Sequence, residues 1–282
     1  GARHKGDIKI LAKMVEPDYG IITTIGPQHL ETFKSLETIE DTKFELAENL
    51  KQDGVMIFNG DSNSTKKLYD RFDGKKYLVC DKNGFSYAED IEINSRGSKF
   101  KLYIDGKQFD IETELLGKCN IDNIVTASTV AYLLEVPRED IENAVKELQP
   151  TKHRLEIIKN NACTVIDDSY NSNIIGCKEA LDTLNMFKGK KIVITPGMVE
   201  LGNEQSEINF KFGGMIADVA DYIIIMNNVN KNEILSGAIA HNFKKENIFF
   251  AETRKKQKEL LEKIVSKDCV ILFENDLPDN YK

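Results

Sequence analysis

A run of seven polar residues, Asp167–Asn173, contains two carboxylates, a tyrosine and two asparagines. It follows directly on the apolar or β-branched positions Cys163–Ile166. Carboxylates at such a point can accept hydrogen bonds from ribose hydroxyls or hold Mg²⁺ through water, whereas an Asx-rich turn can instead cap the next helix. Because a cap needs only one such residue, the run favours a ligand-binding loop.

A histidine and a lysine in the first half are further candidates. His29 ends Gly26–His29 directly after the apolar run Tyr19–Ile25, where it could bind a metal or a phosphate. Lys43 lies in the middle of a helical pattern, and a buried lysine can lose its charge and react with CO₂ to give a metal-binding carbamate. A surface histidine and a solvated helical cation are the simpler interpretations, and spacing does not decide between them.

Two more loops could approach a ligand. Thr195–Gly202 carries two glycines after an apolar strand, which suits either close backbone approach or a plain turn. Leu272–Tyr281 combines two aromatics, a proline and acidic residues, a composition too specific for a fraying terminus.

None of the Gly-Lys pairs is followed by Ser or Thr, so the chain has no GxxxxGK[ST] phosphate loop.

The second half alternates strands with helices, which predicts a mostly parallel, doubly wound, Rossmann-like sheet. The expected strands are 163–167, 190–195, 221–226, 247–250 and 269–273, and the expected helices are 175–186, 204–218, 231–242 and 253–265. In such sheets ligands bind at the carboxyl ends of the strands. That rule selects the loops 167–173, 195–202, 226–230 and 273–279.

The first half predicts a mixed α/β domain with an antiparallel insert. Its expected strands are 19–25, 54–58, 76–80, 99–104 and 108–113, and its expected helices are 35–50, 120–134 and 138–148. Asp105-Gly106 between two of these strands indicates a hairpin. We place the domain boundary near Gln149–Thr151, which gives domains of residues 1–150 and 151–282.

The bulk composition excludes some classes of protein. The 282 residues carry a net charge of 38 − 46 = −8, which argues against a protein that coats nucleic acid or an anionic membrane surface. Five dispersed cysteines without a CxxC pair suggest a reducing cytoplasm, and no run approaches the ~18 apolar residues of a membrane span. We expect a monomer. The chain begins at Gly1, without Met, in a stretch expected to lead into a strand, and this suggests an N-terminal truncation.

The order of several segments resembles the Mur ligase family of ATP-dependent amide-forming enzymes. These segments are GPQHLETF, TKFEL, GKCNIDN, HRLE, DDSYNSN, TPGMVELG and LFENDLPDNY. Family members have a UDP-sugar-binding domain, a central ATPase domain and a Rossmann-like C-terminal domain. The resemblance implies that this chain is the later part of the centre, a P-loop-type domain without its P-loop and metal-binding glutamate, plus the whole third domain.

The resemblance also implies roles for individual residues. His29 matches a Mg²⁺-binding histidine, and Lys43 matches a lysine that is carbamylated in several members and holds a second Mg²⁺. Arg154 matches an arginine that reaches the ATP phosphates and ribose, and Asp168 matches a ribose-binding aspartate.

Further contacts carry over less completely. Asn120 and Asn123 match asparagines beside the adenine. Directly before Asn120, Cys119 stands where the family has a histidine. The residues beside Asp168 would complete the nucleotide site: Tyr170, Asn171 and Asn173. Ile174–Gly176 departs from the family's usual Pro and Ser at the far edge of this site.

The implied activity is ligation of D-alanyl-D-alanine to UDP-MurNAc-tripeptide through an acyl phosphate, with ATP and two Mg²⁺ ions. We expect no ATP turnover by residues 1–282 alone. Two alternatives stay open at this point: another amide ligase of the Mur or folylpolyglutamate-synthase type, and a non-catalytic nucleotide-binding module.

Overall fold

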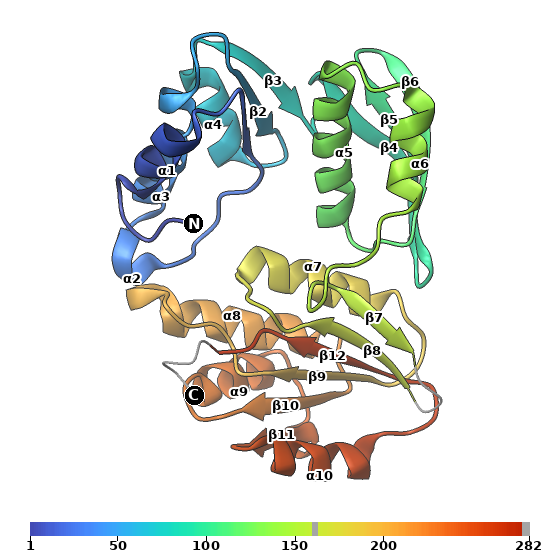
Figure 1. The fold of residues 1–282 in the computed structure, drawn as a ribbon. Helices are drawn as coiled ribbons and strands as arrows, with labels where there is room; N and C mark the ends of the chain where they lie inside the picture. Colours follow the sequence, from blue (N-terminus) through green and yellow to red (C-terminus); the bar gives the residue numbers. More distant parts are fainter. Residues whose placement is uncertain (160–162, 278–282) are drawn as a thin grey trace. The chain divides into compact units, whose positions relative to one another are not determined.

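The computed structural model describes residues 1–159 and 163–277. The chain divides into two compact units, unit 1 of Gly1–Gln149 and unit 2 of Pro150–Lys282. Figure 1 colours unit 1 from blue to green and unit 2 from yellow to red. Each unit has its own six-stranded sheet, and both are α/β as the sequence predicts.

Unit 1 combines a parallel half and an antiparallel half in one sheet of order β1-β2-β3-β4-β5-β6. Its strands are β1 (Tyr19–Ile22), β2 (Val55–Asn59), β3 (Lys75–Val79), β4 (Ser86–Asn94), β5 (Gly97–Ile104) and β6 (Lys107–Thr113). Its helices are α1 (Asp7–Val15), α2 (Leu30–Phe33), α3 (Leu36–Phe44), η1 (Ala47–Asn49), α4 (Asn63–Arg71), α5 (Lys118–Leu133) and α6 (Arg138–Lys146). Strands β1 to β4 pair in parallel, and β4, β5 and β6 are antiparallel.

The β5–β6 hairpin confirms the turn predicted from Asp105-Gly106. The two residues have φ of 50° and 72° and connect the paired residues Ile104 and Lys107. Two successive positive φ values are what a two-residue hairpin turn requires, and glycine adopts them without strain. Local sequence therefore determines this part of the insert.

The opening stretch corrects one expectation. It forms helix α1 before β1 begins, rather than leading straight into a strand. The Glu45 carboxylate accepts hydrogen bonds from the N–H groups of Gly6 and Lys9 at 2.7 and 2.9 Å. A carboxylate at a helix N-terminus satisfies amides that have no partner within the helix. This partner lies more than thirty residues away, so the local pattern did not reveal the helix.

Unit 2 has the mostly parallel sheet that its alternating pattern predicts, in the order β11-β10-β9-β12-β8-β7. Its strands are β7 (Glu156–Lys159), β8 (Cys163–Asp168), β9 (Lys191–Thr195), β10 (Tyr222–Met226), β11 (Ile248–Ala251) and β12 (Cys269–Glu274). Its helices are α7 (Ile174–Asn185), η2 (Gly202–Glu204), α8 (Gln205–Ala217), α9 (Lys231–Ala240), η3 (Lys245–Asn247) and α10 (Arg254–Ile264). The exception is the edge strand β7, which is antiparallel to β8 and was not predicted.

The sheet order of unit 2 brings three candidate loops together. Strands β9, β12 and β8 are neighbours, so the segments that follow their carboxyl ends adjoin one another. On one face of the sheet, Leu260 and Ile264 of α10 pack on a core that includes Ile192, Ile194 and Ile271. Residues 278–281 of the predicted acidic tail lie outside the described residues. Within the described ranges, no helix is both long and apolar enough to cross a bilayer.

Candidate functional site

A tight bend holds the Arg154 segment against the end of β8. His153 and Leu155 both have left-handed backbones, with φ of 62° and 48°. The His153 ring nitrogen Nδ1 lies 2.8 Å from Asp167 Oδ2, and the Leu155 N–H donates to Asp168 Oδ1 at 3.1 Å. Left-handed non-glycine residues persist only where surrounding contacts hold them. These two contacts therefore fix the position of Arg154.

The same bend contains a group with metal-ligand spacing. Ligand atoms of His153, Glu156 and Asp167 lie within 4.8 Å of one another. The Asp167 oxygens are already used, because Oδ1 accepts from the Ser169 N–H and hydroxyl at 3.1 and 2.6 Å while Oδ2 faces His153. Glu156 accepts from the His153 N–H at 3.2 Å. We interpret the group as the clamp of the Arg154 segment.

The Arg154 side chain is exposed but held by the loop that follows β8. Its guanidinium lies 4.5 Å from the centre of the Tyr170 ring, and Nη1 donates to the Asn171 carbonyl oxygen at 2.8 Å. Asp168 is half-buried at the end of β8, and burial raises the pKa of its carboxyl group. The structure thus gathers four predicted nucleotide-binding residues, with a planar cation suited to phosphate beside an acceptor suited to a hydroxyl.

Asn173 is placed differently from these four residues. It is the N-cap of α7, where its Oδ1 accepts from the N–H groups of Ile175 and Gly176 at 3.0 and 3.1 Å. This is the capping role that the Asx-rich run also allowed. A nucleotide contact by Asn173 stays a prediction.

A buried carboxyl group lies among these loops. Glu274, the last residue of β12, is fully buried and pairs with Asp168 in the β8–β12 register. Its Oε1 accepts from the Cys177 thiol at 3.0 Å, and its Oε2 lies 3.5 Å from Thr195 Oγ1. Burial raises the pKa of Glu274 to about 7. The carboxyl group therefore connects the end of β12 to α7 and to the end of β9. Its charge changes near neutral pH.

Asparagine side chains hold the loop after β9 through its backbone. Asn209 forms two hydrogen bonds of 2.9 Å with Met198, donating to its carbonyl oxygen and accepting from its N–H. The next residue after Glu274, Asn275, donates to the Gly197 carbonyl oxygen at 2.7 Å. Gly197 has φ of 76°, and a Cβ there would stand 2.4 Å from Asn209 Oδ1. The loop is therefore rigid, and glycine is required at its first turn.

In unit 1, Lys43 occupies a partly desolvated position. Helix α3 begins at its cap Ser35, whose Oγ accepts from the Thr38 N–H at 3.1 Å. Lys43 lies in the last turn, half-buried, and its Nζ donates to the Thr24 carbonyl oxygen at 3.0 Å. Burial lowers the pKa of Lys43. This environment differs from that of a solvated surface cation and makes the neutral amine easier to form.

His29 lies farther along the segment that accepts the Lys43 bond. It is the N-cap residue of α2, is half-buried and has a φ of 50°. With Gly1–His4 and Asp7 it lines an open cavity of about 480 Å³. Thr24 and His29 both follow β1, so Lys43 of α3 contacts the segment on which His29 lies.

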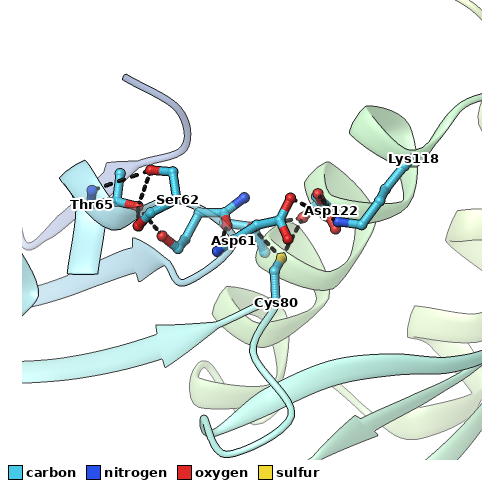
Figure 2. Close-up of polar contacts among 8 residues, drawn as sticks. Asp61, Ser62, Thr65, Cys80, Lys118 and Asp122 are labelled. Carbon is cyan, nitrogen blue, oxygen red and sulfur yellow. Dashed lines mark hydrogen bonds and ion pairs between the residues drawn. The ribbon is translucent and has the colours of Figure 1, made fainter. Parts of the chain in front are cut away.

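Figure 2 shows a polar cluster in unit 1 where β2 and β3 end. Lys118, in the first turn of α5, donates to Asp61 at 3.0 Å and to Asp122 at 2.7 Å. The Cys80 thiol donates to the Asp122 carbonyl oxygen at 3.5 Å, and burial raises the pKa of both Cys80 and Asp122. The cluster ties the start of α5 to the loops after the two strands.

The predicted adenine contacts lie on this same helix start. Asn120 donates to the Leu116 carbonyl oxygen at 2.7 Å, whereas Asn123 and Cys119 are exposed. Residues three apart are neighbours on a helix surface, so Asn120 and Asn123 occupy adjoining positions on α5. The polar cluster therefore sets the orientation of the helix that carries them.

Sequence reasoning missed the members of this cluster. Asp61 follows an apolar strand, the signal that singled out Asp168, and Lys118 and Asp122 have ion-pair spacing on a helix. Both signals were present in the first half of the chain. The contact of Cys177 with Glu274 had no such signal, because it depends on burial.

Comparison with known proteins identifies the family. The Mur ligase middle domain profile matches residues 1–131, and the profile of the Mur ligase, glutamate ligase domain, matches residues 153–273. The chain is 32% identical to the UDP-N-acetylmuramoyl-tripeptide–D-alanyl-D-alanine ligase of Buchnera aphidicola over 84% of its own length and 50% of that protein. It thus spans about half of this curated relative.

Two solved structures have the same fold. MurF from Acinetobacter baumannii is 23% identical, with a TM-score of 0.88, and the match covers 98% of this chain and 60% of that one. MurF from Thermotoga maritima, solved in complex with ADP, is 21% identical with a TM-score of 0.85, covering 96% of this chain and 61% of that one. With both domain profiles matched in order, the chain belongs to the Mur ligase family.

Proposed function

We propose that the protein to which this chain belongs is an ATP-dependent ligase that joins D-alanyl-D-alanine to UDP-MurNAc-tripeptide in peptidoglycan precursor synthesis. The Buchnera relative carries this activity in its name, and the Thermotoga structure holds ADP. The observation that carries the proposal is that Arg154, Tyr170 and Asp168 come together at the carboxyl end of β8 in the unit 2 sheet. We place the protein in the cytoplasm, acting as a monomer.

The reaction would run in two steps. ATP phosphorylates the terminal carboxylate of the tripeptide, which gives an acyl phosphate and ADP. The free amine of D-alanyl-D-alanine then attacks the acyl carbon, and the tetrahedral intermediate loses phosphate to leave an amide. Negative charge builds on phosphoryl and carbonyl oxygens in both steps, so a preorganised cation lowers the barrier.

The described residues support a division of nucleotide contacts. Asp168 accepts from ribose hydroxyls, and the Arg154 guanidinium binds phosphate oxygens while its own position is held by Tyr170 and Asn171. Asn120 and Asn123 contact the adenine from the start of α5. The first two residues belong to unit 2 and the asparagines to unit 1, so each unit would contribute its own nucleotide contacts.

Lys43 and His29 fit a magnesium site if Lys43 is carbamylated. Burial lowers the pKa of Lys43, which makes available the neutral amine that reacts with CO₂. Carbamate oxygens are hard donors of the type that Mg²⁺ prefers, and His29 lines the cavity after the same strand. Two bound Mg²⁺ ions would neutralise charge on the phosphates. Lys43 and His29 would hold and orient them.

The test is phosphate release by the complete protein with ATP and UDP-MurNAc-tripeptide. Release is expected to require D-alanyl-D-alanine among a panel of amines that includes D-alanine, L-glutamate and L-lysine. Preference for L-glutamate with a folate acceptor would instead indicate a folylpolyglutamate-synthase-type ligase. Nucleotide binding without release for any acceptor would indicate a non-catalytic module.

A further inference from the structure

Two cysteines begin neighbouring strands at the end of the unit 2 sheet opposite Asp168 and Glu274. Cys163 is the first residue of β8 and Cys269 the first residue of β12, and the two are direct partners in the parallel register. Neighbouring strands lie about 4.8 Å apart. That separation falls within the roughly 4.4–6.8 Å between Cα atoms that a disulfide spans.

Both side chains point to the same face of the sheet. Cys269 is 1% exposed in the apolar core beneath α10, and Cys163 packs against that core while remaining half-buried. The two cysteine side chains interact, and burial raises the pKa of Cys269. The sulfur atoms are therefore already neighbours, with one of them accessible and the other shielded.

Two of the remaining cysteines have other partners. The Cys177 thiol donates to Glu274, and the Cys80 thiol donates to the Asp122 carbonyl oxygen. The exposed Cys119 lies in unit 1, at the start of α5. In the sheet of unit 2, register and packing select Cys163 and Cys269 as a pair.

We propose that Cys163 and Cys269 are a reversible modification site, which a low-molecular-weight disulfide such as glutathione disulfide converts to an intramolecular disulfide. The Cys163 thiolate attacks one sulfur of glutathione disulfide, breaking its S–S bond and releasing one glutathione thiolate. Cys269 then loses its proton and attacks the Cys163 sulfur, releasing the second glutathione. Two protein thiols are oxidised and one glutathione disulfide is reduced to two thiols.

The division of labour follows from exposure. Attack on the external disulfide needs access, which Cys163 has, and a thiolate, which burial disfavours at Cys269. The second step needs only that Cys269 reach its register partner. The new bond would join β8 to β12 at the end opposite Asp168 and Glu274, so it is independent of the proposed ligase activity.

The experiment equilibrates the reduced chain in glutathione buffers of increasing oxidised fraction. Free thiols, including the buried Cys269, are then alkylated as the protein is unfolded in denaturant, and the protein is digested without reductant for mass spectrometry. The expected result is a linked Cys163–Cys269 peptide that dithiothreitol removes. Persistent alkylation of Cys269 with only a glutathione adduct on Cys163, or no change at either residue, would overturn the proposal.

Two variants serve as matched controls. Cys163→Ser is expected to abolish the linked peptide and leave Cys269 alkylated, whereas Cys119→Ser is expected to leave the link unchanged. A link that survives Cys163→Ser would show that Cys269 pairs elsewhere. If the Cys163→Ser chain does not fold, the peptide map of the wild-type chain decides the question by itself.

Discussion

Units 1 and 2 both place candidate residues at the carboxyl ends of parallel strands, but they hold them by different means. In unit 2 the loops are fixed by buried contacts, such as those of Glu274 with Cys177 and of Asn209 with Met198. In unit 1 the partly buried Lys43 donates a hydrogen bond to the Thr24 carbonyl oxygen, and Asp61 forms an ion pair that is about half exposed to water. Unit 2 therefore presents loops that are held in place by buried contacts, whereas the reactivity of Lys43 in unit 1 depends on its desolvation.

The largest effect is expected at Lys43. Lys43→Ala removes the amine that would carry the carbamate, and loss of a preorganised charge partner typically costs on the order of 10²–10³ in rate. Ligation by the complete protein should fall by at least that factor in a steady-state phosphate-release assay, and added bicarbonate should not restore it. Lys51→Ala is the control, because Lys51 makes an exposed ion pair with Asp18 at 2.9 Å. Wild-type turnover in Lys43→Ala would end the carbamate hypothesis.

Glu274 provides a test of the buried network in unit 2 through pH. Its folded-state pKa of about 7 lies above the ordinary value of 4.5, so the folded state binds the proton more tightly than the unfolded state. Stability should therefore fall as pH rises from about 4.5 to 7, by on the order of 3 kcal/mol. Glu274→Gln keeps the shape without the charge and should remove this part of the pH dependence.

Chemical denaturation followed by circular dichroism at pH 5 and pH 8 measures the effect. The difference in unfolding free energy between the two pH values should be smaller in Glu274→Gln than in the wild-type chain. Equal pH dependence in both proteins would mean that Glu274 is not the titrating group.

Gly197 tests the rigidity of the loop after β9. Gly197→Ala places a Cβ 2.4 Å from Asn209 Oδ1 at a residue with φ of 76°. Strain and overpacking of this kind cost about 1–3 kcal/mol. Gly106→Ala has a similar φ of 72° with no atom within 4 Å of the added Cβ, so it isolates the backbone cost. Equal melting temperatures for the two variants would contradict the tight packing of Gly197.

The smallest effect is expected in the polar cluster of unit 1. Asp61→Asn weakens its ion pair with Lys118, and the Asp61 side chain is 55% exposed. Exposed pairs contribute roughly 0.2–1 kcal/mol, and salt screens them. The loss in unfolding free energy should match that of Asp90→Asn, which weakens the exposed pair with Lys101. A loss of several kcal/mol would show that unit 1 is locked as firmly as unit 2.

Most elements of the fold follow from local patterns in the sequence. The alternation of apolar runs and amphipathic stretches predicts the parallel sheet of unit 2, and Asp105-Gly106 predicts the hairpin of unit 1. Helices α1, α2 and α4 and strands β4 and β7 escaped prediction. The amides at the start of α1 bond to the distant Glu45 carboxylate, and β7 is an edge strand of four residues with a single neighbour.

The candidate site was only partly predictable for a similar reason. The run Asp167–Asn173 stands out because polar residues follow a strand, and the structure brings Arg154 to it. Which of its residues face a ligand depends on three-dimensional neighbours: Asn173 caps α7 while Tyr170 lies beside Arg154. Glu274 lay within a predicted loop, but its full burial and raised pKa depend on packing among three elements.

The α/β class, the family resemblance and the loops that could bind a ligand follow from the sequence, because local residue order and residue type specify them. The environment of the side chains in those loops emerges only from the fold. The contact of Leu155 with Asp168 holds the Arg154 segment in place. Burial lowers the pKa of Lys43 and raises the pKa of Glu274 to about 7. This is because access to water and the neighbours of a charge are set by residues far apart in the chain.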